Sequence, residues 1–137
     1  MKKLLLLLLF VSNLAFAQKT EYAYKAQSGT YDKSEQKWVW DELQESEMSI
    51  KLDGVKVYIE NKSNTVLTTY EKITTKSGVD DDGDKYKLHT WYAYDNKNRK
   101  CKFSMIYYDD LPLVIYTVFY NDVAFRFYIR NNKLSNF

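Results

Sequence analysis

The sequence predicts an all-β protein, in which a single antiparallel meander of about nine strands is curled into a small barrel or folded into a two-sheet sandwich. Two observations indicate this class. Beyond residue 18, apolar residues recur with period two along most of the chain, which is the spacing of half-buried strands. Aromatic residues make up 17% of the chain and proline occurs once, a composition that suits strands.

The N-terminal segment is expected to be a secretory signal peptide over residues 1–17. Lys2 and Lys3 precede an apolar run, and the segment Ala15–Ala17 has the small-x-small pattern that precedes a signal peptidase cut. The run is too short for a membrane-spanning helix, which needs about 20 apolar residues. We therefore expect a periplasmic or secreted protein, with one β domain over residues 18–137 and no membrane span after cleavage.

The charge argues against nucleic acid as a partner, and the cysteine content excludes an internal disulfide. The formal net charge is +2, and both excess positive charges belong to the expected signal peptide. No cluster of lysine and arginine is present to follow a phosphate backbone, so nucleic acid is not an expected partner. Cys101 is the only cysteine, so the fold forms without an internal disulfide, and we expect this thiol to lie in the core.

Three hairpins are predicted from turn residues between strand-like segments. Asp53-Gly54 favours a type I′ turn, residues 96–99 indicate a four-residue turn, and Asn121-Asp122 indicates a two-residue turn. The cross-strand pairs expected from these turns are Leu52 with Val55 and Ile50 with Val57, Tyr94 with Cys101 and Tyr92 with Phe103, and Val118 with Phe125 and Tyr116 with Phe127. Other strands are expected over residues 20–27, 36–41 and 65–75.

His89 is the only histidine of the chain. A histidine-based metal site would therefore need its other ligands from other residue types, and a Cys-His pair would have to use this imidazole. The predicted second hairpin places His89 on the opposite face of the sheet from Cys101. The sequence therefore favours a structural or surface role for this histidine.

The segment 80–84, Asp-Asp-Asp-Gly-Asp, is the part of the chain that most resembles a metal-binding loop. Clustered carboxylates around a glycine are typical of calcium loops. The spacing does not match an EF-hand, because Gly78 and His89 would fall at the first and last ligand positions. The pattern favours a solvated turn without a cofactor, and a calcium site built on Asp80, Asp82 and Asp84 is the alternative.

Aromatic strand faces supply the candidate binding residues. Trp38 and Trp40 alternate on one side of a strand, which favours a place in the core, with a platform for sugar rings or an apolar ligand as the alternative. The last hairpin is apolar on both faces, so it is expected to be central in the fold or covered by a partner. The candidate binding residues are Trp38, Trp40, Ile115, Phe119 and Tyr128.

The sequence contains no phosphate-binding loop, paired-cysteine metal motif or nucleophile elbow. We therefore expect a non-enzymatic module that binds a protein or a small ligand through aromatic strand faces or loops. Two alternatives remain open at this point. One is a small hydrolase with an unpatterned pair of carboxylates, and the other is a closed barrel that carries an apolar ligand inside.

Overall fold

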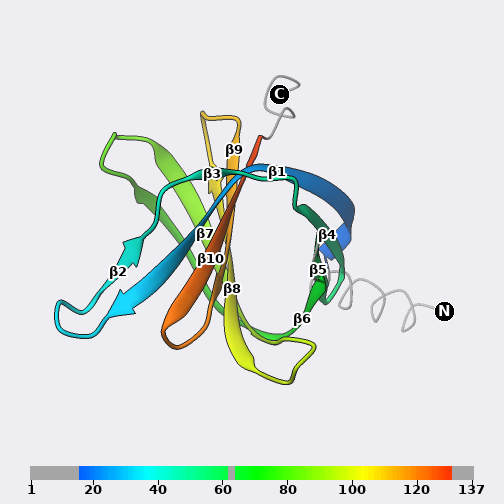
Figure 1. The fold of residues 1–137 in the computed structure, drawn as a ribbon. Coiled ribbons are helices and arrows are strands. Elements are labelled where there is room, and N and C mark those ends of the chain that lie inside the picture. Colours follow the sequence, from blue (N-terminus) through cyan, green and yellow to red (C-terminus); the bar gives the residue numbers. More distant parts are fainter. Residues whose placement is uncertain (1–15, 62–63, 131–137) are drawn as a thin grey trace.

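The computed structural model of the protein describes residues 16–61 and 64–130, so residues 1–15 of the expected signal peptide lie outside the described part. Antiparallel strands close into an eight-stranded barrel with two short strands added (Figure 1). The strands are β1 (Phe16–Asp32), β2 (Lys37–Trp40), β3 (Gln44–Glu45), β4 (Ser49–Gly54), β5 (Lys56–Glu60), β6 (Asn64–Val79), β7 (Lys85–Tyr94), β8 (Lys100–Tyr108), β9 (Leu113–Phe119) and β10 (Val123–Arg130). Within these ranges, no helix is long and apolar enough to cross a membrane.

The long first strand closes the barrel. From β4 to β10, each strand pairs with the next one in the chain, as a meander requires. One edge of β1 pairs with β10, from Ala23–Ile129 to Thr30–Val123, and its other edge pairs in turn with β4, β3 and β2. The pairing of β1 with β10 leaves a barrel rather than a two-sheet sandwich. The predicted all-β meander is thus confirmed, with β3 as an additional strand.

The core lies inside the barrel and receives side chains from all eight barrel strands. Phe103 and Tyr116 are its largest fully buried members, and their ring centroids lie 5.7 Å apart. The core residues are Ala23, Ile50, Leu52, Val57, Ile59, Leu67, Ala93, Cys101, Phe103, Met105, Val114, Tyr116, Val118, Phe127 and Ile129. Cys101 is therefore a core residue, as predicted.

A polar group also lies among these apolar side chains. The hydroxyl of Tyr116 donates a hydrogen bond to Glu21 Oε1 at 2.7 Å, and Lys19 Nζ lies 3.1 Å from the same carboxylate oxygen. Burial, together with the negative charge of Glu21, raises the pKa of Tyr116. The Tyr116 hydroxyl therefore stays protonated and donates its hydrogen bond to Glu21, so this buried polar group has a hydrogen-bond partner.

The third predicted hairpin is confirmed, whereas the first has a different turn. Val118 pairs with Phe125 and Tyr116 with Phe127, as expected. In the first hairpin Asp53 pairs with Lys56, so the turn is Gly54-Val55 and Gly54 takes the positive φ of 61°. The expected pairings of Leu52 with Val55 and of Ile50 with Val57 are both wrong, because Leu52 pairs with Val57 and Ile50 with Ile59. The shift of two residues keeps these four paired residues on their predicted face but places Val55 in the turn, where it is 41% exposed.

The register of the second hairpin is wrong by one residue. Its turn has five residues, because Tyr94 pairs with Lys100 and Ala93 with Cys101. The cause is Asp95, whose Oδ1 accepts hydrogen bonds from the backbone N–H groups of Lys97 and Arg99. This slip turns the even-numbered side chains of β7 away from the core. Tyr92 and Tyr94 therefore lie on the outer face of the barrel, and His89 shares the inner face with Cys101.

Candidate functional site

A cleft of about 730 Å³ lies on the outer face of the barrel. Most of its lining is aromatic, and the rest is polar or basic. The lining residues are Tyr31, Trp38, Tyr70, Thr90, Tyr92, Lys100, Cys101, Lys102, Phe119, Tyr120 and Asn121. Its volume lies within the range of about 300–1,000 Å³ that is usual for small-molecule sites.

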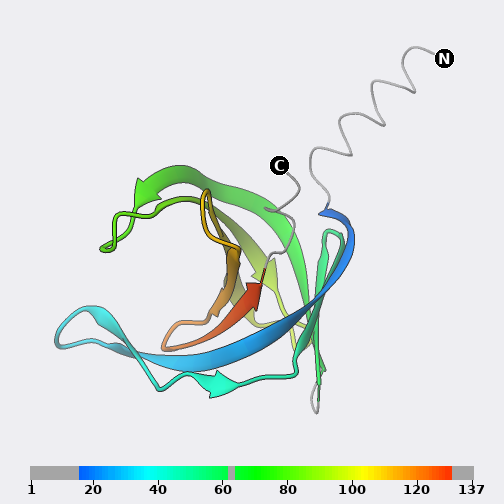
Figure 2. The same ribbon diagram turned by 90° about the horizontal axis from the view of Figure 1, so that it is seen from above.

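Two hairpins form the walls of this cleft, and the outer face of β8 and β9 forms its floor. The β1–β2 hairpin contributes Tyr31 and Trp38, and the β6–β7 hairpin contributes Tyr70 and Tyr92. Figure 2 shows these two hairpins projecting on the same side of the strands β8–β10. Both hairpins extend beyond the closed part of the barrel because β1 and β6 are long, with 17 and 16 residues.

The register of the sheet brings residues from six strands into one row on this face. Each member of the row is the cross-strand partner of the next, so all of them point outwards. The row consists of Tyr92, Lys102, Phe119, Ala124, Gly29 and Trp40. In the neighbouring row, Thr90, Ser104 and Thr117 are partners, and the last two are buried. Small polar residues therefore lie beside the larger aromatic ones.

The aromatic rings of the walls are packed against one another. On one side, the ring of Trp38 lies 5.4 Å from that of Tyr31 and 5.4 Å from that of Phe119. On the other side, Tyr70 stacks on Tyr92 at 6.0 Å and on Tyr94 at 5.1 Å. Such pairs contribute roughly 0.5–1.5 kcal/mol each beyond their buried area. The packing holds the walls in place without a ligand.

Trp40 is held close behind the cleft by two contacts. The guanidinium of Arg126 lies 3.6 Å from its ring centroid, and a Cβ atom at Gly29 would lie 2.7 Å from its Cε3 atom. Gly29 does not take a positive φ, so it is the approach of the indole ring that requires glycine here. The guanidinium stack and the bare glycine backbone together fix the ring in one place.

Gly29→Ala is expected to lower the free energy of unfolding by about 1–3 kcal/mol, because the new methyl group would push Trp40 off its stack with Arg126. Equilibrium unfolding in urea would measure the loss. In a Trp40→Ala background the same substitution should cost much less, since the clashing ring is gone. An equal cost in both backgrounds would contradict the role given to this close approach.

The charges at the cleft are positive. Lys100 and Lys102 are exposed on β8 and both line the cleft, whereas none of the described lining residues carries a carboxylate. Lys102 Nζ lies 5.9 Å from the ring centroid of Tyr92. In the part of the chain that the structure describes, neither lysine forms an ion pair. The cleft therefore presents two unneutralised positive charges between aromatic walls.

The structure brings three of the five predicted binding residues together. Trp38 and Phe119 line the cleft, and the ring of Trp40 lies 6.5 Å from that of Phe119. Neither tryptophan belongs to the barrel core, and both are half-buried. Ile115 and Tyr128 are partners on the same outer face, but they do not line the cleft. Ile115 is 7% exposed, as expected for a central strand.

Sequence reasoning missed the other wall of the cleft. With the predicted register, Tyr92 pointed into the core, and nothing placed Tyr70 next to it. The signal in the sequence was Asp95, because an Asp at the start of a turn often caps backbone N–H groups of the residues that follow. A five-residue turn closed by Asp95 turns Tyr92 and Lys102 to the same outer face.

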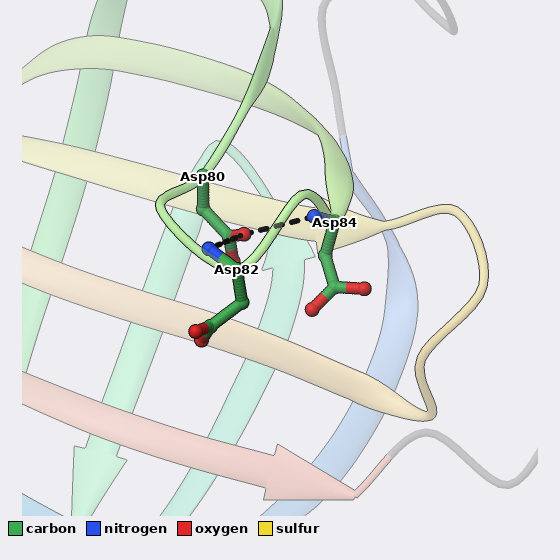
Figure 3. A group of neighbouring side chains, drawn as sticks. All are labelled: Asp80, Asp82 and Asp84. Carbon is green, nitrogen blue, oxygen red and sulfur yellow. Dashed lines mark hydrogen bonds between the residues drawn. The ribbon is translucent and has the colours of Figure 1, made fainter.

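The predicted acidic loop connects β6 and β7, away from the residues that line the cleft. Asp80, Asp82 and Asp84 each offer a carboxylate oxygen within 4.8 Å of the others (Figure 3). Asp80 Oδ1 already accepts hydrogen bonds from the backbone N–H groups of Asp82 at 3.0 Å and Asp84 at 2.9 Å. Gly83 takes a φ of 86°. Backbone hydrogen bonds from Asp80 N–H to the Asp84 carbonyl and from Gly83 N–H to the Asp80 carbonyl complete the loop.

His89 and Cys101 do not form a pair, although they share the inner face. Their partners on adjacent strands are Met105 and Ala93, so the two residues are separated by four positions, or about 14 Å. His89 Nδ1 lies 3.3 Å from Thr75 Oγ1, and its pKa is lowered by burial and by nearby lysines. Burial raises the pKa of Cys101 to about 11.

Fold and site together define a small closed β-barrel with an aromatic, positively charged cleft on its outer face. Comparisons with protein-family models, with curated proteins and with solved structures found no match.

Proposed function

We propose that this protein is an exported, non-enzymatic binding protein that takes a small ligand into the aromatic cleft. The observation that carries the proposal is the cleft itself, whose walls come from two hairpins and hold partly exposed rings in a packed arrangement. Tyr70 is 52% exposed, and partly exposed aromatic clusters of this kind are typical of binding sites. Export is inferred from the expected signal peptide.

The chemistry of the cleft supports binding rather than catalysis. Its lining offers no carboxylate, histidine or serine among the described residues. Cys101 also borders the cleft, but its side chain belongs to the barrel core. Burial raises the pKa of this thiol to about 11, so the reactive thiolate is scarce at neutral pH. The hydrolase alternative would need a pair of carboxylates at the site of reaction, and the described lining of the cleft has none.

The filled barrel favours the cleft over an internal site. Core side chains from all eight strands meet inside the barrel, and Phe103, Tyr116, Leu67 and Ile50 are fully buried there. An apolar ligand inside would have to displace these residues. The outer cleft requires no such rearrangement.

Trp38→Ala and Tyr70→Ala are each expected to weaken ligand binding about ten-fold or more, because each removes a ring from a different wall of the cleft. A thermal-shift screen would first find a ligand for the full chain, and calorimetry would then compare the variants. Tyr22→Ala is the matched control, since Tyr22 is 70% exposed and does not line the cleft.

Each variant must also be unfolded in urea, because loss of binding through loss of folding would not support the site. Binding that survives both wall substitutions would contradict the proposed function. Binding lost equally in Tyr22→Ala would contradict it too.

We further propose that the acidic loop works without a metal. Asp80 Oδ1 already caps two backbone N–H groups, and the three carboxylates of Asp80, Asp82 and Asp84 together fall short of the roughly six to eight oxygen ligands that calcium takes. Millimolar calcium is therefore expected to leave the melting temperature unchanged, as measured by scanning calorimetry with a chelator as the reference. A calcium-dependent rise that disappears in Asp82→Asn would contradict this expectation.

A further inference from the structure

We propose that the ligand of the cleft is an acidic oligosaccharide, with sugar rings lying on the aromatic walls and carboxylates meeting Lys100 and Lys102. This inference rests on the proposed function and names the class of ligand. It follows from the positive charge of the lining, from the arrangement of the aromatic rings and from the pairing of the strands beneath them.

The lining of the cleft is positively charged. Lys100 and Lys102 occupy alternate positions of β8, so their side chains leave the same face about 7 Å apart. No carboxylate of the described lining neutralises them, and the described acids form their ion pairs with other cations, as Asp95 does with Arg99. An anionic group that enters the cleft would therefore gain two charge-assisted hydrogen bonds.

The aromatic rings of the walls indicate which kind of molecule carries the anionic group. Trp38 and Tyr31 lie on one side of the lysines, and Tyr70 and Tyr92 lie on the other. The face of an aromatic ring is negative and attracts the C–H groups on the flat side of a sugar ring. Asn121 and the hydroxyl of Thr90 add polar groups to the lining, which suit the hydroxyls of a sugar better than a purely apolar ligand.

The strands beneath the cleft argue against a peptide that binds as an added strand. β7, β8 and β9 are each paired on both sides, so their backbone groups are satisfied and cannot add a peptide strand. Recognition must come from side chains. A single-stranded nucleic acid would also stack on aromatic rings, but it needs a continuous track of positive charge. The two lysines of the described lining do not form such a track.

Calorimetry of the full chain at low salt would test the inference with three acidic probes, namely trimers of galacturonate, mannuronate and glucuronate, and with cellotriose as the neutral probe. At least one acidic trimer is expected to bind about ten-fold or more tightly than cellotriose. In the double variant Lys100→Met, Lys102→Met this preference should disappear, while the long apolar stems of the side chains are kept.

Lys56→Met is the matched control, because Lys56 is exposed on β5 and does not line the cleft. Equal binding of cellotriose and the acidic trimers would overturn the acidic class while leaving the proposed function intact. An oligothymidylate, measured in the same way, is the nucleic-acid probe, and its tighter binding would overturn the acidic sugar class in favour of nucleic acid. Binding of none of the three acidic trimers would also overturn it, and the thermal-shift screen would then decide the proposed function separately.

Discussion

Asp95→Ala is expected to lower the free energy of unfolding by about 3 kcal/mol, since it removes the acceptor of several hydrogen bonds at one end of the barrel. Asp95 is 4% exposed. Its Oδ1 caps the backbone N–H groups of Lys97 and Arg99, and its Oδ2 accepts from Arg99 Nε at 2.8 Å and from the Tyr120 hydroxyl at 2.9 Å. Without the carboxylate, the half-buried hydroxyl of Tyr120 loses its partner.

The loss of stability caused by Asp95→Ala should depend on pH. Burial alone would raise the pKa of Asp95, but the hydrogen bonds from Arg99, Tyr120 and Lys97 outweigh it, and the pKa lies below its ordinary value of 3.8. The charged form is therefore favoured in the folded state, and its contribution is fully present above that value. The stability difference between the natural protein and the variant should narrow as the pH falls below 3.8 and through the lower pKa of the folded state.

Urea unfolding at neutral pH and at a series of acidic pH values would measure both effects. Asp110→Ala is the control, because Asp110 is exposed in the next turn and accepts no side-chain hydrogen bond among the described contacts. A loss below about 1 kcal/mol for Asp95→Ala, similar to that of an ordinary exposed position, would show that the turn does not depend on this carboxylate.

Phe103→Ala is expected to lower the free energy of unfolding by about 3–5 kcal/mol, the usual cost of emptying a buried phenylalanine site. Phe103 is 0% exposed, and its ring lies 5.7 Å from that of Tyr116 and 6.1 Å from that of Trp91. These neighbours are held by their own strands and cannot close the cavity. Chemical denaturation, with the slope of the transition checked for two-state behaviour, would measure the loss.

Phe125→Ala is the matched control for this substitution. Phe125 is 41% exposed and pairs with Val118 on β9, so the same atoms are removed from a site that water can fill. We expect a loss of about 1 kcal/mol or less. Similar losses at both positions would contradict the expectation that the cost of Phe103→Ala comes from a closed, fully buried cavity.

The sequence was sufficient for the fold class, for the register of the last hairpin and for the faces of the paired residues in the first. In the last hairpin, apolar side chains on both strands allow only one register, and Asn121-Asp122 fits between them. In the first, the alternation of apolar residues set the faces correctly. The turn itself moved to Gly54-Val55, because burying Val57 and Ile59 across from Leu52 and Ile50 gains more than burying Val55 at the tip.

The second hairpin could not be read in the same way, because β7 offers aromatic residues on both faces. Trp91 and Tyr92 suit a core equally well by residue type, so the alternation does not choose between them. The choice depends on the hydrogen bonds of Asp95 in the turn, which act through atomic geometry rather than hydropathy. A slip of one residue then reverses every side chain of the strand.

The cleft could not be predicted from the sequence. Its walls meet because β1 and β6 extend beyond the barrel, so that Trp38 and Tyr70, far apart in the chain, line one space. Periodicity shows that such residues lie on a strand face, but it does not show which faces approach one another. Trp38 and Phe119 were found because they are aromatic, whereas Lys100 and Lys102 carry no such mark in the sequence.

The buried thiol of Cys101 has a practical consequence for following ligand capture in solution. It is the only cysteine of the chain, and with a pKa of about 11 it stays protonated and unreactive towards maleimides at neutral pH. A cysteine introduced at the rim of the cleft, as in Asn121→Cys, would therefore be labelled alone. A fluorophore or spin label there would report occupancy of the cleft without any need to remove the natural thiol from the core.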